Sequence, residues 1–172
     1  GAVPEKPEIE AGALPFFVLD EEQMTLTYRM AQHDRVYGLG ENLRGINKRG
    51  WIYESKCTDD PNHMEEKRSL YAAHNFFVGD GSETFGVFVD YPGIVSFDIG
   101  YTKMEELKIQ ASDWNLDVYV ITGMDVKDIV KQFRKMIGRS YIPPLWAFGY
   151  GQSRWGYRSE DDVREVVKAY RD

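Results

Sequence analysis

The stretch F-F-V-G-D-G-S-E-T-F-G-V-F-V, residues 76–89, decides the fold class of this chain. Residues 76–78 and 84–89 are rich in aromatic and β-branched side chains, which favour strands. Gly79, Asp80 and Gly81 lie between them, and an Asp-Gly pair readily adopts the positive φ that tight hairpin turns need. The stretch therefore predicts a β-hairpin.

Short strand candidates continue on both sides of this hairpin. Met24, Leu26, Tyr28 and Met30 alternate with polar residues, the period of two that is typical of a half-buried strand. The complete set of further candidates is residues 16–19, 24–30, 36–39, 51–53, 94–99, 107–111 and 116–121. So many short strands at this spacing indicate an antiparallel β-sandwich.

The pattern changes after Gly123, where apolar residues recur at helical spacing. We expect Asp125 to be the N-cap of a helix and Gly138 to end it. The apolar face of this predicted helix consists of Val126, Ile129, Val130, Phe133 and Ile137.

The last thirty residues predict one strand–loop–helix unit. Pro143 and Pro144 interrupt the chain, and residues 145–150 form a continuous apolar run, which is typical of a strand buried on both faces of a parallel sheet. A loop over 151–158 follows, and Ser159 with Asp162 predicts a capping box at the start of a second amphipathic helix. Because a lone strand of this kind leaves its edges unpaired, we expect a longer polypeptide or packing on another chain.

Composition excludes several classes of protein. The 172 residues carry a net charge of −7, which disfavours nucleic-acid binding, and the 42% hydrophobic content disfavours disorder. No apolar run approaches the ~20 residues of a membrane helix, and the N-terminus lacks the pattern of a signal peptide. The single cysteine, Cys57, fits a reducing compartment, so we expect a cytoplasmic protein. The 14% aromatic content favours β structure and suits sugar binding, where rings stack on pyranose faces.

Two positions are candidate binding residues, each with a plain structural alternative. Asp59 precedes Asp60 and Pro61, and such acids either cap a turn or accept hydrogen bonds from sugar hydroxyls. Trp155 lies in the loop after the predicted buried strand, which on a barrel faces the catalytic side. It is either a platform for a ring or a loop anchor.

Other motifs carry no chemistry in our interpretation. The Gly-x-Gly sequences at 38–40 and 149–151 lack the strand and helix context of a dinucleotide site and are interpreted as turn glycines. His33, His63 and His74 are scattered without paired ligands, so no metal site is expected.

The sequence P-P-L-W-A-F-G-Y-G-Q-S-R-W-G-Y at 143–157 resembles the opening segment of the catalytic barrel in glycoside hydrolase family 31, the α-glucosidase and α-xylosidase family. Y-G-L-G-E-N at 37–42, S-L-Y-A-A-H-N-F-F at 69–77 and D-V-K-D-I-V-K-Q-F at 125–133 are similar to its N-terminal sandwich and connecting helix. G-I-N-K-R-G at 45–50 and C-T-D-D-P at 57–61 resemble the bacterial intracellular α-glucosidases. The resemblance runs from about Val36 to the C-terminus.

This resemblance implies a mainly β fold. Residues 1–122 would form a galactose-mutarotase-like β-sandwich, 123–141 a linking helix, and 142–172 the first βα unit of a (β/α)8 barrel. It also implies the N-terminal part of a retaining exo-α-glucosidase, with an α-linked oligosaccharide as substrate and no cofactor. The remaining barrel, or a neighbouring chain, would pack on the C-terminal unit.

By the same resemblance, Asp59 and Trp155 match residues that line the aglycone side of the sugar site. The nucleophile and the acid/base of the family are aspartates on later barrel strands, and neither motif occurs in residues 1–172. The chain alone is therefore predicted to be inactive.

Two other functions remain open. One is a non-catalytic carbohydrate-binding module. The other is a sugar mutarotase, which needs an acid and a base in one pocket, and the dispersed histidines do not indicate such a pair.

Overall fold

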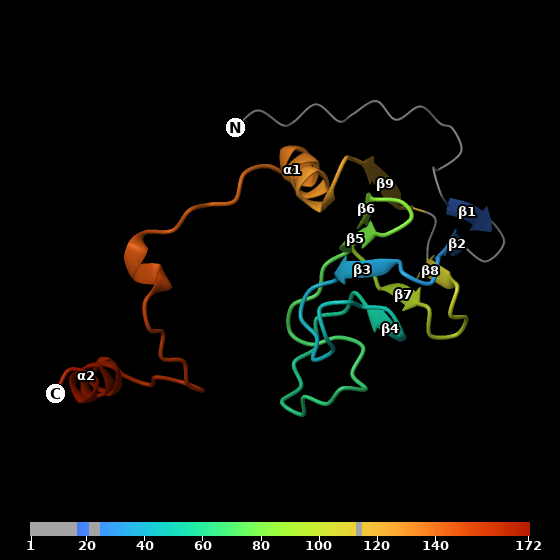
Figure 1. Cartoon of the computed structure of the whole chain (residues 1–172). Coiled ribbons are helices and arrows are strands. Elements are labelled where there is room, and N and C mark those ends of the chain that lie inside the picture. Colours follow the sequence, from blue (N-terminus) through green and yellow to red (C-terminus); the bar gives the residue numbers. More distant parts are fainter. Residues whose placement is uncertain (1–16, 21–24, 113–114) are drawn as a thin grey trace. The chain divides into compact units, whose positions relative to one another are not determined.

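The computed structural model describes residues 17–20, 25–112 and 115–172 (Figure 1). Two of the residues used in the strand predictions, Phe16 and Met24, lie outside these ranges. The chain divides into two units, residues 1–139 and residues 140–172, and each is described by itself.

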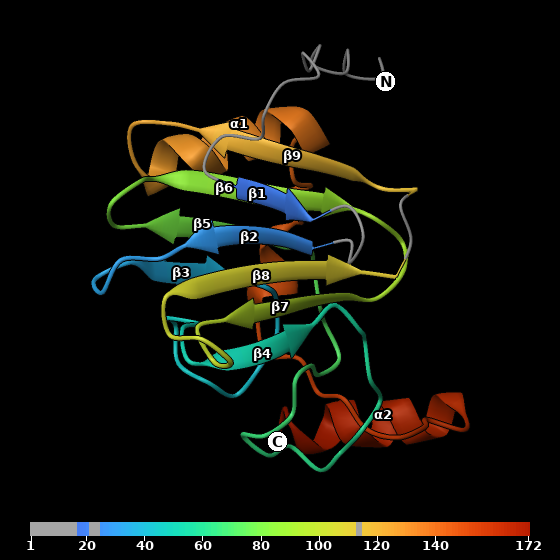
Figure 2. The same ribbon diagram turned by 90° about the vertical axis from the view of Figure 1, so that its right-hand side faces the viewer.

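The described part of the first unit contains two antiparallel sheets. One has the order β1-β2-β8-β7-β4 and the other the order β3-β5-β6-β9. Figures 1 and 2 show them as stacked layers, as the sequence predicts for a sandwich. The strands are β1 (Phe17–Asp20), β2 (Thr25–Arg29), β3 (Arg35–Gly38), β4 (Trp51–Glu54), β5 (Phe76–Asp80), β6 (Phe85–Asp90), β7 (Val95–Ile99), β8 (Glu106–Ala111) and β9 (Asp117–Thr122).

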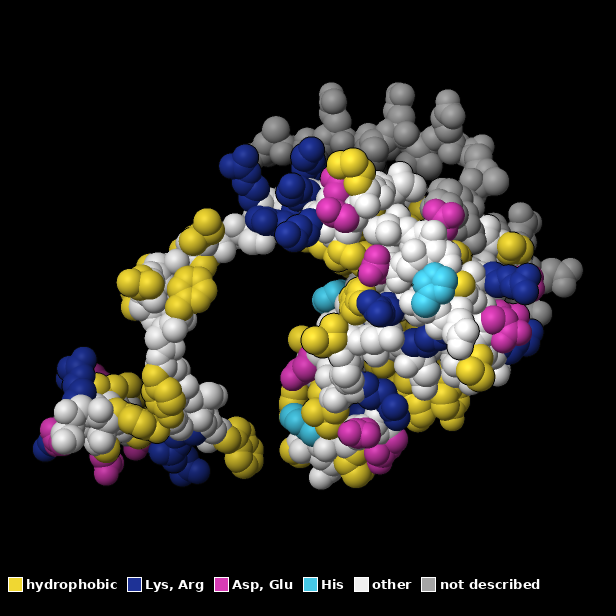
Figure 3. Space-filling model, in the orientation of Figure 1, with side chains coloured by type: hydrophobic (Ala, Val, Ile, Leu, Met, Phe, Trp, Pro, Cys, Tyr) yellow, Lys and Arg dark blue, Asp and Glu magenta, His cyan; other side chains and the backbone are white. Residues whose placement is uncertain are grey.

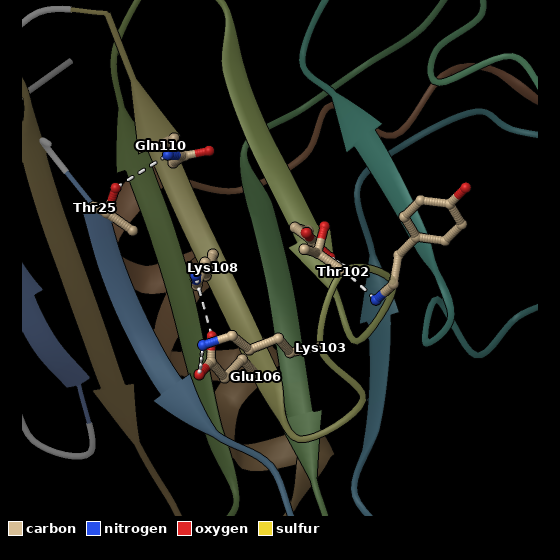
Figure 4. A network of polar contacts seen from close by, with 8 residues as sticks. Thr25, Thr102, Lys103, Glu106, Lys108 and Gln110 are labelled. Atoms are coloured by element: carbon tan, nitrogen blue, oxygen red, sulfur yellow. Dashed lines mark hydrogen bonds and ion pairs between the residues drawn. The ribbon is translucent and has the colours of Figure 1, made fainter.

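The hydrophobic core fills the space between the two sheets. Alternate residues of β7, namely Val95, Phe97 and Ile99, are buried, as are Leu107 and Ile109 of β8. The other face of the five-stranded sheet is polar. There Gln110 donates to Thr25, and Lys103 and Lys108 both pair with Glu106 (Figure 4). The alternation of apolar and polar residues thus places one face of this sheet in the core.

Helix α1 (Val126–Ile137) covers the outer face of the four-stranded sheet. The sequence prediction is confirmed at both ends: Asp125 accepts from the Asp128 amide, and Gly138 ends the helix with φ of 99°. Ile129 is fully buried against the sheet, and the Phe133 ring stacks on Phe76 at 3.8 Å between centroids. The helix therefore seals a second, smaller apolar layer.

The predicted hairpin forms, but its turn differs from the prediction. Strand β5 continues through Asp80, which pairs with Arg35 of β3, so the turn spans residues 81–84. Neither Asp80 nor Gly81 has a positive φ. Gly81 is required for another reason, because a Cβ there would collide with the side chain of Asp34. The long-range contact, rather than the turn type, selects glycine.

The second unit contains a 3-10 helix η1 (Leu145–Phe148) and helix α2 (Glu160–Ala169). The capping box of Ser159 and Asp162 is confirmed. The strand predicted over residues 145–150 is wrong in this structure. A strand needs neighbouring strands to pair its backbone groups, and residues 140–172 contain none. These residues instead turn into a short helix with exposed apolar side chains, seen as the yellow groups of this segment in Figure 3.

Among the described helices, none has both the length and the apolar character needed to cross a bilayer.

Candidate functional site

Asp59 lies on the long loop between β4 and β5, residues 55–75. The loop folds back on itself: the Glu54 amide donates to Arg68 O at 3.1 Å, and the Thr58 amide donates to Leu70 O at 2.8 Å. Leu70 is buried, which anchors the returning half of the loop. These contacts give residues 55–75 a defined path without regular secondary structure.

Asp60 has the structural role that the turn interpretation predicts. Its Oδ1 accepts from the Asn62 amide at 2.9 Å, and its Oδ2 pairs with Lys67 Nζ. The hydrogen bond from Lys67, followed by that from Asn62, lowers the pKa of the Asp60 carboxyl below its ordinary value. Asp60 is therefore an ionised turn acid around which the loop closes.

Asp59 differs from its neighbour. Its side chain is exposed, and among the described residues it makes no hydrogen bond or ion pair. Thr58 on one side and Asp60 on the other are both held by the loop contacts above. The loop thus presents the Asp59 carboxylate to solvent with both oxygens available as acceptors.

The same loop also exposes aromatic surface. The rings of His63 and Tyr71 meet edge to face at 5.3 Å between centroids, and both side chains are exposed. A carboxylate and aromatic rings on one loop are the side-chain types that contact sugar hydroxyls and sugar faces.

Trp155 belongs to the second unit, so the structure does not join it with Asp59 in one described site. Its side chain is fully exposed within this unit, between Arg154 and Gly156, whose φ is 85°. The Arg154 guanidinium lies over the Tyr157 ring at 5.5 Å, and the Gly156 amide donates to Arg154 O at 2.9 Å. Within residues 140–172, Trp155 packs on nothing, and its indole is available to a ligand or to another part of the protein.

The G-I-N-K-R-G motif at 45–50 stabilises the loops of the sandwich. Lys48 is buried, and its Nζ donates to Asn42 Oδ1 at 2.6 Å and to Gly45 O at 2.9 Å. Arg49 donates to Ala31 O at 2.6 Å and to Met104 O at 2.7 Å, which ties two loops to its own. Both cations therefore donate to neutral oxygens of the surrounding loops and act as structural residues of the sandwich.

The three histidines have separate neighbours. His33 lies beside Ser82, His63 packs on Tyr71, and His74 Nδ1 accepts from the Phe76 amide. No group of three or more His, Cys, Asp or Glu side chains within the described ranges could hold a metal ion. The described residues therefore show neither a histidine pair nor a metal cluster.

Lys67 is the residue of this site that sequence reasoning missed. It pairs with Asp60 across seven positions of an irregular loop, and no periodic pattern connects the two residues. The only local signal was Asp-Pro at 60–61, which predicts a turn but not the partner that closes it.

The architecture defines a class of protein: two stacked antiparallel sheets, covered on one side by α1, followed by a separate helical unit. Residues 16–98 match the "Glycosyl hydrolase 31 N-terminal galactose mutarotase-like domain". Residues 140–172 match the "Glycosyl hydrolases family 31 TIM-barrel domain". The chain belongs to glycoside hydrolase family 31, as its sequence motifs predict.

Relatives with known names agree with this assignment. The chain is 35% identical over 144 residues to alpha-glucosidase 2 of Bacillus thermoamyloliquefaciens, covering 82% of this chain and 18% of the relative. It is 28% identical over 136 residues to an alpha-glucosidase of Saccharolobus solfataricus, covering 78% and 20% of the two chains. The chain thus spans about a fifth of the length of these relatives.

A solved structure supports the fold over most of the chain. The family 31 dextranase of Flavobacterium johnsoniae, complexed with glucose, superposes with a TM-score of 0.78 at 26% identity. The match covers 91% of this chain and 19% of the dextranase. The names of these three relatives are those of glycosidases.

Proposed function

We propose that the chain is the N-terminal part of a retaining exo-α-glucosidase that releases terminal α-linked glucose from oligosaccharides. The observation that carries the proposal is membership of family 31 together with similarity to two proteins named alpha-glucosidase. The similarity to a dextranase supports a glycosidase of the same family, although that relative is named for a different substrate. The proposed preference for a terminal glucose rests on the first two relatives.

In this proposal the sandwich loop contributes to substrate binding rather than to bond cleavage. Asp59 accepts hydrogen bonds from hydroxyls of the sugar beyond the scissile bond, and Trp155 lines the same aglycone side. Support for Asp59 comes from its exposed, unbonded carboxylate between two tethered neighbours. Support for Trp155 comes from its fully exposed indole in the loop after η1.

Bond cleavage requires a pair of carboxyl groups ~5 Å apart across the glycosidic bond. One attacks to form a glycosyl-enzyme, and the other donates a proton to the leaving oxygen and then activates water. We assign both carboxyl groups to barrel strands that residues 1–172 do not include. In this proposal the chain supports the fold and lines the aglycone side of the sugar site, and the barrel carries the catalytic carboxyl groups.

The test uses a polypeptide that contains this chain followed by a complete family 31 barrel. Proton NMR of an α-linked glucose oligosaccharide should show α-glucose appearing first and the oligosaccharide shortening one glucose at a time. Initial release of β-glucose would contradict retention, and internal cleavage would contradict exo action. Residues 1–172 alone should release no product from a chromogenic α-glucoside above a boiled control.

A further inference from the structure

We propose that Lys67 and Asp60 are positioning residues that hold Asp59 in its binding geometry. This inference rests on the function proposed above for Asp59. It concerns a pair that touches no substrate itself and that acts through the neighbouring backbone.

The Asp60 carboxylate is bonded on both of its oxygens. Oδ1 accepts from the Asn62 amide at 2.9 Å, which closes a turn, and Oδ2 accepts from Lys67 Nζ. Both partners of the ion pair are half-buried, so their geometry is more restricted than that of a freely exposed pair. Because Asp60 follows Asp59 directly, fixing its side chain also fixes the peptide unit that Asp59 shares with it.

Lys67 is in turn held by the frame of the sandwich. The Lys67 amide donates to Met64 O at 3.0 Å, and Arg44 Nε donates to Glu65 O at 3.0 Å in the same turn. The Arg44 guanidinium lies over the Trp51 ring of β4 at 3.8 Å. Contacts therefore run without interruption from a sheet strand to the residue beside Asp59.

The loop offers a matched comparison for this pair. Arg68, the next residue, forms an ion pair of 2.9 Å with Glu54 at the base of the loop. That pair joins the loop to the end of β4, and within the described ranges its side chains form no hydrogen bond or ion pair with the turn around Asp60. Arg68→Met removes the same charge from the same loop without loosening the support of Asp59.

The experiment measures kcat/KM of the polypeptide with a complete barrel on an α-linked glucose disaccharide and on an aryl α-glucoside. Lys67→Met should lower the value for the disaccharide by about tenfold or less, because a displacement near 1 Å weakens an oriented contact. The loss on the aryl glucoside should be clearly smaller, since its leaving group makes no hydroxyl contacts. Lys67→Arg should restore the disaccharide value, and Arg68→Met should leave both values unchanged.

Two Asp60 variants separate the ion pair from the turn. Asp60→Asn keeps an oxygen for the Asn62 amide but replaces the Oδ2 acceptor that faces Lys67 with an NH2 donor, so it should behave like Lys67→Met. Asp60→Ala loses both contacts and should be worse on the disaccharide. If Asp60→Asn has the same kcat/KM for the disaccharide as the wild type, the role of the ion pair is overturned.

A double-mutant cycle with Asp59→Ala makes the test decisive. If Lys67 acts through Asp59, Lys67→Met should cause no further loss of disaccharide activity once Asp59 is alanine. An undiminished further loss would overturn the proposal. If kcat/KM for the disaccharide falls selectively in Asp59→Ala but not in Lys67→Met, the positioning role of Lys67 is overturned, while the binding role of Asp59 stands. No selective loss in Asp59→Ala would overturn the proposed role of Asp59, and positioning with it.

Discussion

At the scale of single residues, Asp34 is the clearest structural carboxylate of the sandwich. It is buried, and it accepts hydrogen bonds from the Ala31 amide at 2.8 Å, the Ser82 amide at 2.8 Å and the Tyr28 hydroxyl at 3.0 Å. Burial alone raises the pKa of Asp34, but these hydrogen bonds outweigh it and leave the pKa below its ordinary value. The ionised form thus joins two loops that are distant in sequence.

We expect Asp34→Asn to lower the free energy of unfolding by about 2 kcal/mol at neutral pH, because its amide nitrogen replaces an acceptor with a donor. Urea denaturation measures this change, with Asp90→Asn on the exposed end of β6 as the control. A loss no larger than that of the control would contradict the assignment.

The contribution of Asp34 to the free energy of unfolding depends on pH, and the direction of this dependence follows from its pKa. Since the pKa of Asp34 is lower in the folded state than in the unfolded chain, its contribution is complete above the unfolded pKa and is lost as pH falls through the folded pKa. Stability of the wild type should therefore decline between about pH 5 and pH 2, and the decline should be shallower in Asp34→Asn. Parallel declines in thermal melts over this range would contradict the linkage.

The sequence could indicate Asp59 but not Asp34 or Lys67. Asp59 stands in a motif whose residues adjoin one another, whereas Asp34 meets Ser82 across 48 positions. Such a contact exists only once β2, β3 and the hairpin of β5 and β6 have come together. No local sequence pattern therefore predicts the contact between Asp34 and Ser82.

At the scale of elements, α1 and the four-stranded sheet meet through a glycine. A Cβ on Gly86 of β6 would lie 2.5 Å from Ile129 Cγ2, closer than real side chains pack. We expect Gly86→Ala to cost about 1–3 kcal/mol of unfolding free energy, because the helix must move outward.

The Ile129→Ala background tests the origin of this cost. Removing the methyl group that the new Cβ would meet should make the Gly86→Ala penalty much smaller, a non-additive result typical of residues in contact. Gly45→Ala, with open space at its Cβ, serves as the control. An unchanged penalty in the Ile129→Ala background, measured by chemical denaturation, would contradict this packing.

Elements differ in how fully the sequence predicts them. Helix α1 carries its own signals: an N-cap, an apolar face and a terminal glycine, all of which act within one segment. Residues 145–150 have the composition of a buried strand, but a strand exists only where another strand pairs with it. Residues 140–172 contain no strand that could pair with them, so the composition alone did not produce a strand.

At the scale of the whole molecule, the two units differ in how well they bury their apolar surface. The sandwich has a core of fully buried side chains such as Phe77 and Phe97, whereas Leu145, Trp146, Phe148 and Tyr150 are exposed in the second unit. In the chain of residues 1–172, we expect amides 145–150 to exchange with solvent orders of magnitude faster than those of β6 and β7, because little burial protects them. Hydrogen exchange measured by mass spectrometry tests this, and equal protection of both regions in a monomer would contradict it.

We infer that the sandwich loop of this family 31 chain binds the aglycone sugar through Asp59. Steady-state kinetics of Asp59→Ala in the polypeptide with a complete barrel tests it most directly, with Glu66→Ala as a charge-matched control on the same loop. We predict a fall of about tenfold or more in kcat/KM for an α-linked glucose disaccharide, since one or two charge-assisted hydrogen bonds of about 1.5–3 kcal/mol are lost. The fall for an aryl α-glucoside should be much smaller. Equal losses on the two substrates, or a loss no greater than that of Glu66→Ala, would contradict the account.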